Sequence, residues 1–118
     1  VTAAFNLNLL VRANRELGAT FDLDAFAHRA LYDADKGRVE MHLVSGAEQC
    51  VRVEDRPFEF AAGETIHTEN SYKYTIGEFQ DLARAAGYQP QAVFTDSEAL
   101  FSVHVLQVRT ISLSHPPR

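Results

Sequence analysis

The sequence has little of several residue types, and each shortage excludes a class of protein. It contains one cysteine, Cys50, and no tryptophan among 118 residues. A single thiol can form neither an intrachain disulfide nor a thiolate metal cluster, so nothing in the composition indicates an oxidising compartment. The default expectation is a cytoplasmic protein.

Positive charge and long apolar runs are also scarce. The Lys and Arg residues number 11 and are scattered, whereas Asp and Glu number 16, and the formal net charge is −5. Nucleic-acid binding depends on clustered basic residues. No run approaches the ~20 apolar residues of a membrane span, and the first residues lack the basic and apolar parts of a signal peptide. Neither nucleic acid nor a membrane is therefore an expected partner.

Clusters that would carry familiar site chemistry are missing as well. The six glycines stand apart, whereas a nucleotide loop needs several together. No two histidines have the HxxxH or HxH spacing that places two imidazoles on one face, so no metal site is expected. His42 and His104 alternate with apolar residues and are interpreted as sheet residues. Ser71 has no G-x-S-x-G elbow around it, which disfavours a hydrolase.

The hydrophobic fraction of 46 % and the charged fraction of 23 % are ordinary for a folded globular protein. The apolar spacing predicts a helix over residues 2–17, with Thr2 as its cap and Gly18 as its stop. A second, shorter helix is predicted within residues 21–37, with Asp22 as N-cap.

From Arg38 the apolar period changes to two, which predicts strands. The pattern favours an antiparallel hairpin over residues 38–53 with its turn at Gly46. Further short strands are expected to complete a small antiparallel sheet that ends near Tyr74.

The last part of the chain predicts one more helix and two strands. Thr75 is a candidate N-cap, Glu78 its capping-box partner and Gly87 the stop, and two β-prone runs follow. The predicted fold class is therefore α+β, with residues 1–72 and 73–110 as two portions and residues 111–118 as a frayed tail.

The densest polar cluster is HTENSYKY, residues 67–74. In an extended strand Glu69 and Ser71 project from the same side, where a carboxylate and a hydroxyl can bind an imidazole. The alternative is that these residues only form the loop and cap of the following helix, and the local pattern alone favours this alternative.

A series of longer segments carries a family resemblance. TAAFNLNLL, NRELG, FDLDAF, RVEMHL, the ENS of HTENSYKY and FTDSEALFSVHVL occur in that order. From Val1 to about Val108 the sequence resembles the C-terminal region of the histidine-specific methyltransferases of ergothioneine biosynthesis. That family transfers methyl groups from S-adenosylmethionine to the α-amino nitrogen of histidine.

The resemblance also implies site residues. Glu69 and Ser71 would hydrogen-bond the substrate imidazole, with Asn70 between them and Met41 lining the pocket; no catalytic residue is implied on this chain. A carboxylate that accepts from one ring N–H and a hydroxyl that serves the other nitrogen would select histidine and fix its tautomer.

The family's glycine-rich cofactor loop and the acidic residue for the cofactor ribose are missing from the sequence. No cofactor is therefore expected on this chain alone, and alone it is expected to be inactive. Residues 1–72 would belong to the substrate-binding domain, and residues 73–110 would complete a class I methyltransferase sheet. The sheet edge and apolar face left exposed would favour a homodimer. One alternative is a non-catalytic module that binds a histidine-like ligand or pairs with a separate cofactor-binding chain. The other is a purely structural association domain.

Overall fold

The computed structural model describes residues 1–110, which fall into two compact units. The first unit is Val1–Lys73, and the second begins at Tyr74. Each unit combines one α-helix with antiparallel strands, so the fold class is α+β as predicted. The predicted tail, residues 111–118, lies outside the described residues.

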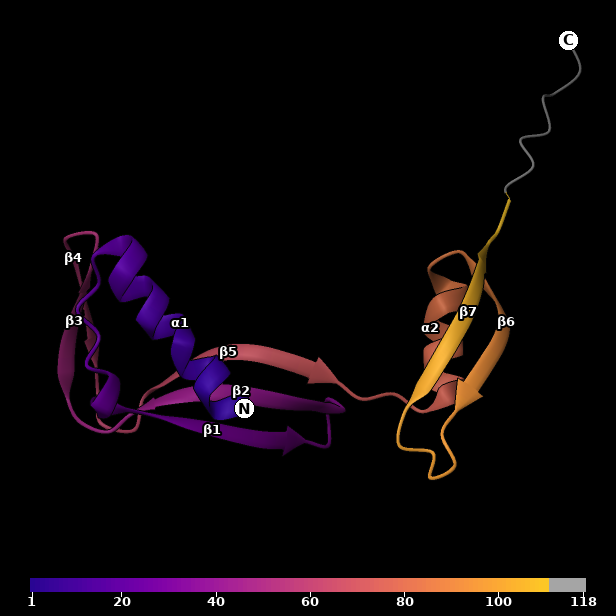
Figure 1. Cartoon of the computed structure of the whole chain (residues 1–118), viewed down its shortest axis with the longest axis horizontal. Coiled ribbons are helices and arrows are strands. Elements are labelled where there is room, and N and C mark those ends of the chain that lie inside the picture. The colour runs from indigo at the N-terminus through magenta and orange to yellow at the C-terminus, as the bar shows by residue number, and fades with distance from the viewer. Residues whose placement is uncertain (111–118) are drawn as a thin grey trace, which may run out of the picture. The chain divides into compact units, whose positions relative to one another are not determined.

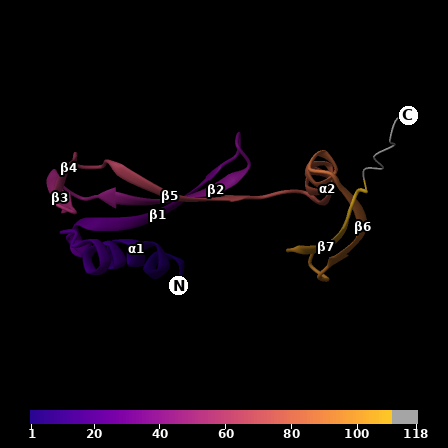
Figure 2. The ribbon, with the colours of Figure 1, turned by 90° about the horizontal axis from the view of Figure 1, so that it is seen from above.

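Helix α1 (Thr2–Leu17) confirms the first predicted helix. It ends at Gly18, which adopts the left-handed conformation (φ 58°) that favours glycine at a helix C-terminus. The N-cap is Val1 and not the predicted Thr2, and no side chain caps this end. The helix lies along one face of the main sheet of its unit (Figures 1 and 2).

The main sheet contains three antiparallel strands in the order β1 (Phe26–Asp33), β2 (Arg38–Ser45), β5 (Thr65–Tyr72). The second helix predicted within residues 21–37 is therefore wrong: only the short 3₁₀ turn η1 (Leu23–Ala25) is helical there, and Asp22 accepts a hydrogen bond from the Asp24 N–H. The apolar residues of this segment suit either period. All eight residues of β1 pair with β2, and this pairing stabilises a strand rather than a helix.

Strands β3 (Gln49–Val53) and β4 (Arg56–Phe60) form a separate two-stranded sheet. The predicted hairpin over residues 38–53 is wrong, because β2 pairs with β1 and β5 while β3 pairs with β4. The turn of the β3–β4 hairpin places both Glu54 and Asp55 at positive φ. Two-residue hairpin turns of this kind match the right-handed twist of the strands.

The core of the first unit is small and joins α1 to both sheets. Its buried residues are Leu10, Phe26, Leu43 and Val51, surrounded by the partly buried Leu7, Phe21, Val53, Phe60 and Ile66. Phe26 and Phe60 meet edge to face with ring centroids 5.5 Å apart, an arrangement that adds to the stabilisation from buried area. This core holds β2 and β5 against α1.

The second unit has the predicted helix and two strands. Thr75 and Glu78 form the predicted capping box at the start of α2 (Ile76–Ala85). Strands β6 (Tyr88–Thr95) and β7 (Ser102–Val108) pair as an antiparallel hairpin. α2 packs on one face of this hairpin, where the Phe79 and His104 rings lie 4.4 Å apart.

Candidate functional site: two faces of the β2–β5 pair

A β-bulge at Thr68 determines which face each polar residue of β5 occupies. Met41 pairs with Glu69, but the next residue, His42, pairs with His67, so Thr68 is the extra residue. In a regular strand His67 and Glu69 would share a face. The bulge instead places Glu69 on the face of Met41, and His67 on the face of His42.

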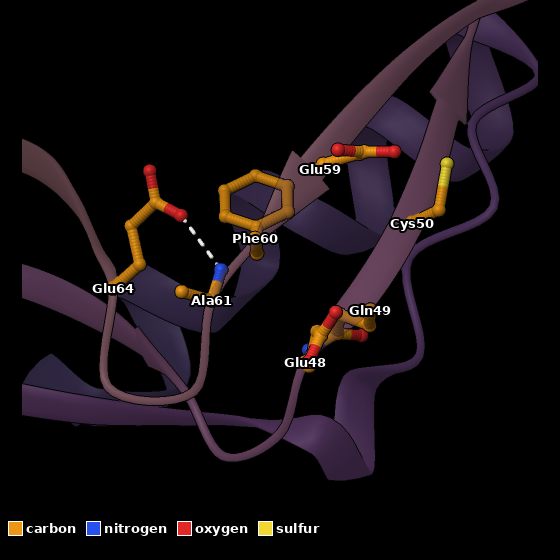
Figure 3. A pocket seen from close by; sticks show the side chains of 7 residues that line it. All are labelled: Glu48, Gln49, Cys50, Glu59, Phe60, Ala61 and Glu64. Carbon is orange, nitrogen blue, oxygen red and sulfur yellow. Dashed lines mark hydrogen bonds between the residues drawn. The ribbon is translucent and has the colours of Figure 1, made fainter.

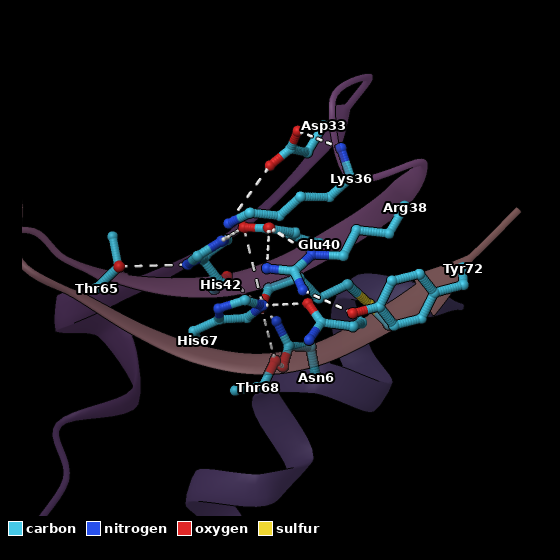
Figure 4. Close-up of polar contacts among 12 residues, drawn as sticks. Asn6, Asp33, Lys36, Arg38, Glu40, His42, Thr65, His67, Thr68 and Tyr72 are labelled. Atoms are coloured by element: carbon cyan, nitrogen blue, oxygen red, sulfur yellow. Dashed lines mark hydrogen bonds and ion pairs between the residues drawn. The ribbon is translucent and has the colours of Figure 1, made fainter.

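Asn6 of α1 holds this bulge in place. The Thr68 hydroxyl lies 2.6 Å from Asn6 Oδ1 and 3.1 Å from the Met41 carbonyl oxygen, its two acceptors. Asn6 Nδ2 donates to the carbonyl oxygen of His42 at 3.2 Å and lies 2.9 Å from Nδ1 of His28. Asn6 is buried, so its amide bonds both strands at the point where their register shifts (Figure 4).

The face turned toward α1 contains Met41, Glu69 and Ser71. Ser71 pairs with Val39, two residues before Met41 on β2, so the three side chains share this face. Glu69 borders a hollow of about 200 Å³, lined by Phe5, Asn6, Asn8, Leu9, Arg12, Thr68 and Glu69. Because pockets for whole drug-like ligands measure roughly 300 to 1,000 Å³, this hollow suits one small ring.

Two polar side chains of this face, Glu69 at the hollow and Ser71 beside it on β5, can form further hydrogen bonds. Within residues 1–110 no protein group hydrogen-bonds the exposed Glu69 carboxylate. Ser71 Oγ accepts from Lys73 Nζ at 2.8 Å, which leaves its hydroxyl hydrogen free to donate. A carboxylate and a hydroxyl two residues apart can therefore bind the two nitrogens of an imidazole.

Asn70 lies on the opposite face, because it pairs with Glu40. Its Oδ1 is 2.6 Å from Nε2 of His67. The β2–β5 pair thus places Met41, Glu69 and Ser71 on one face and turns the side chain of Asn70, the fourth residue predicted from the sequence, to the other. Asn6 was not named; the only signal for it is an amide on the apolar side of the first helix.

The opposite face contains a network around Glu40. Arg38 donates to Glu40 Oε2 from Nε and Nη2, each at 2.8 Å, and His42 Nε2 lies 3.0 Å from Oε1. The Arg38 and His42 hydrogen bonds lower the pKa of Glu40 from 4.5 to about 2. Glu40 and His42 are both buried, and Arg38 also donates to the Tyr72 hydroxyl at 2.8 Å.

A second, wider hollow of about 660 Å³ lies at the β3–β4 sheet (Figure 3). Its lining is acidic, with Glu48, Glu59 and Glu64, together with the Cys50 thiol. Glu64 accepts a hydrogen bond from the Ala61 N–H. No hydroxyl side chain lines this hollow, so it lacks the carboxylate and hydroxyl pair that would select an imidazole.

The fold and the smaller hollow therefore define a class of protein: an α+β chain with a small, partly polar hollow between a helix and a sheet. Residues 1–108 match the family model described as histidine-specific methyltransferase, SAM-dependent. The chain belongs to this family.

Two curated relatives agree with this assignment. The chain is 53 % identical over 105 residues to the histidine N-alpha-methyltransferase of Mycolicibacterium smegmatis. It is 40 % identical over 105 residues to the enzyme of the same name from Mycobacterium tuberculosis. Each match covers 87 % of this chain and 33 % of the relative, so the chain spans about a third of the length of these relatives. In residues 1–110, no helix has the length and apolar character to cross a membrane.

Proposed function

We propose that this chain supplies the imidazole-binding part of the substrate pocket in an S-adenosylmethionine-dependent methyltransferase that methylates the α-amino nitrogen of histidine. The observation that carries the proposal is the placement of Glu69, Ser71 and Met41 on one face, with Glu69 at the ring-sized hollow. Family membership and the names of the two relatives support the substrate.

In this proposal Glu69 accepts a hydrogen bond from one imidazole N–H, Ser71 serves the other nitrogen, and the Met41 thioether packs against the ring. Asn70 contributes through its main chain, which keeps Glu69 and Ser71 in register. The pocket acts by positioning: a fixed imidazole orients the amine for methyl transfer, and orientation alone can supply much of a rate enhancement.

The described residues do not fit the cofactor itself. Such cofactors bind where parallel strands are followed by a glycine-rich turn and a helix. Within residues 1–110 every strand pairing is antiparallel, and no cluster of glycines follows a strand. We therefore assign only the histidine side chain to these residues and derive no step through S-adenosylmethionine.

The second unit has a separate part in the proposal: β6 and β7 complete a class I methyltransferase sheet. The support is that both faces of the hairpin are apolar. One face packs on α2, and the other exposes Phe94, Val103 and Val105. Strands that are apolar on both faces are typical of the middle layer of an α/β sheet.

The test uses this chain inside a complete enzyme. Residues 1–108 replace the matching segment of the Mycolicibacterium smegmatis relative, and kcat/KM for histidine is measured. We expect an active chimera in which Glu69→Gln lowers kcat/KM about 5- to 30-fold, since a neutral amide replaces the carboxylate and a hydrogen bond to a charged group contributes roughly 1 to 2 kcal/mol more than a neutral one.

The matched control is Glu59→Gln, at the acidic hollow on the other sheet, which should leave kcat/KM within about twofold of the parent chimera. Equal kcat/KM values for the Glu69 variant and the parent would reject the imidazole-binding role.

A further inference from the structure

Three metal-ligating side chains meet on the face of the β2–β5 pair that is turned away from the proposed imidazole hollow. Glu40 Oε1 lies 3.0 Å from Nε2 of His42 and 3.8 Å from Nε2 of His67. One ligand atom from each of the three residues lies within 4.8 Å of the other two. The bulge at Thr68 is what brings His67 to this face.

We propose that Glu40, His42 and His67 bind one divalent transition-metal ion of the zinc class. Two imidazoles and one carboxylate form a ligand set that suits zinc and leaves an open position. At zinc–ligand distances near 2.0 to 2.1 Å, tetrahedral ligands lie about 3.3 Å apart. The observed separations of 3.0 and 3.8 Å lie on either side of this value.

Neighbouring polar groups orient one oxygen of Glu40 and one ring nitrogen of His42 toward the position of the ion. Arg38 donates to Oε2 of Glu40, so Oε1 is left facing the two imidazoles as a single ligand atom. His42 Nδ1 lies 3.2 Å from Thr65 Oγ1. Without a metal, His42 Nε2–H donates to Glu40 Oε1, and the ion replaces that proton. The ring then donates its Nδ1–H to Thr65, and ligating histidines are usually oriented by such a partner.

Metal binding requires one ring to move. The His42 and His67 rings are stacked, with centroids 4.4 Å apart and planes at 27° (Figure 4), whereas an ion must lie near the plane of both rings. His67 has to turn out of the stack and release Asn70 Oδ1. This rotation is feasible because the His67 side chain is 36 % exposed and β5 is an edge strand of its sheet.

The proposal is independent of the histidine substrate, because the two sites use opposite faces of the strands. Zinc is titrated calorimetrically into the full chain after removal of metal by a chelator, and the histidine ring resonances are followed by NMR. We expect one ion per chain. The rings of His42 and His67 should shift, while those of His28 and His104 should not.

Variants locate the ligands without disturbing the core. His67→Ala should weaken zinc binding at least about tenfold, and Thr65→Val, which removes the partner of His42, should weaken it about 10- to 100-fold. The control His104→Gln, in the second unit, should bind zinc as the unaltered chain does. The absence of saturable binding, or equal affinity in His67→Ala, would overturn the proposal.

Discussion

At the residue scale, one buried amide connects the helix to the site. Asn6 bonds the Thr68 hydroxyl, the His42 carbonyl oxygen and the ring of His28. Because a buried polar group is costly when unpaired, the buried Asn6 amide depends on these partners. The same contacts fix the bulge that separates Glu69 from His67, so one side chain determines the composition of both faces.

The first prediction is that Asn6→Ala destabilises the chain by about 1 to 3 kcal/mol, because it removes the hydrogen bonds of a buried amide to both strands. Urea unfolding followed by circular dichroism measures the change. Asn8→Ala, at an exposed position of the same helix, is the matched control and should stay within about 0.5 kcal/mol of the parent. Similar losses in the two variants would show that the Asn6 contacts contribute nothing specific.

Asp96 gives a second residue-scale prediction, in the β6–β7 loop. Partial burial raises the pKa of Asp96, but hydrogen bonds from the Phe101 and Leu100 N–H groups outweigh it and hold the pKa below its ordinary value. A depressed carboxyl pKa stabilises the folded state above the ordinary pKa, and this stabilisation is lost as the pH falls through the folded-state pKa.

The amide proton shifts of Leu100 and Phe101 should therefore titrate with a midpoint below about 3.9, the ordinary pKa of Asp. An NMR pH titration measures this midpoint. Asp96→Asn should abolish the titration, whereas Asp35→Asn, in the first unit, should leave it unchanged. A midpoint at or above the ordinary value would contradict the loop geometry.

At the element scale, the two helices begin in different ways. Thr75 accepts from the Glu78 N–H, and the Glu78 carboxylate accepts from the Thr75 N–H, a complete capping box. Thr2 stands at the start of α1, where no side chain caps the helix. The chain therefore contains a functional cap and a matched threonine that does not cap.

We expect Thr75→Ala to destabilise the second unit by about 1 kcal/mol, within the usual range of 0.5 to 2 kcal/mol for a lost N-cap. Thr2→Ala should change stability by less than about 0.5 kcal/mol. Thermal unfolding of both variants provides the comparison. A larger loss for Thr2→Ala than for Thr75→Ala would show that the capping assignment is wrong.

At the scale of the whole molecule, the chain exposes much of its apolar surface. The outer face of the β6–β7 hairpin carries Phe94, Val103 and Val105, with exposed fractions of 61 %, 53 % and 46 %. Exposed patches of neighbouring apolar residues usually mark interaction surfaces. Under the proposed function, helices of the complete enzyme would cover this face, and in the isolated chain the same exposed face favours self-association.

The final prediction is that the isolated chain forms dimers or larger species, measured by light scattering after size-exclusion chromatography. Val103→Lys should shift the chain toward the monomer, because a charge at the centre of the apolar face opposes its burial. Leu17→Lys, an exposed apolar position of the first unit, is the control. A monomer at all concentrations would refute the homodimer prediction.

Local signals made the ends of the chain predictable. The capping residues around Thr75, the stop at Gly18 and the β-prone runs after Gly87 act through neighbouring residues, so their elements could be predicted. The helix predicted within residues 21–37 is wrong over the segment 26–33, whose apolar residues fit both the helical and the strand period. Only the pairing with β2 distinguishes a strand from a helix here, and a local sequence pattern does not show which segments pair.

The same distinction between local sequence signals and tertiary contacts applies to the site. The sequence by itself determined the family, the α+β class and the pairing of Glu69 with Ser71 on one side of an extended strand, because residue identity and a period of two are local properties. Tertiary structure alone decided that Asn70 faces away, that Asn6 supports the bulge, and that His67 meets Glu40 and His42. A bulge shifts the register by one residue only when two strands and a helix come together, and one residue of shift moves a side chain to the other face.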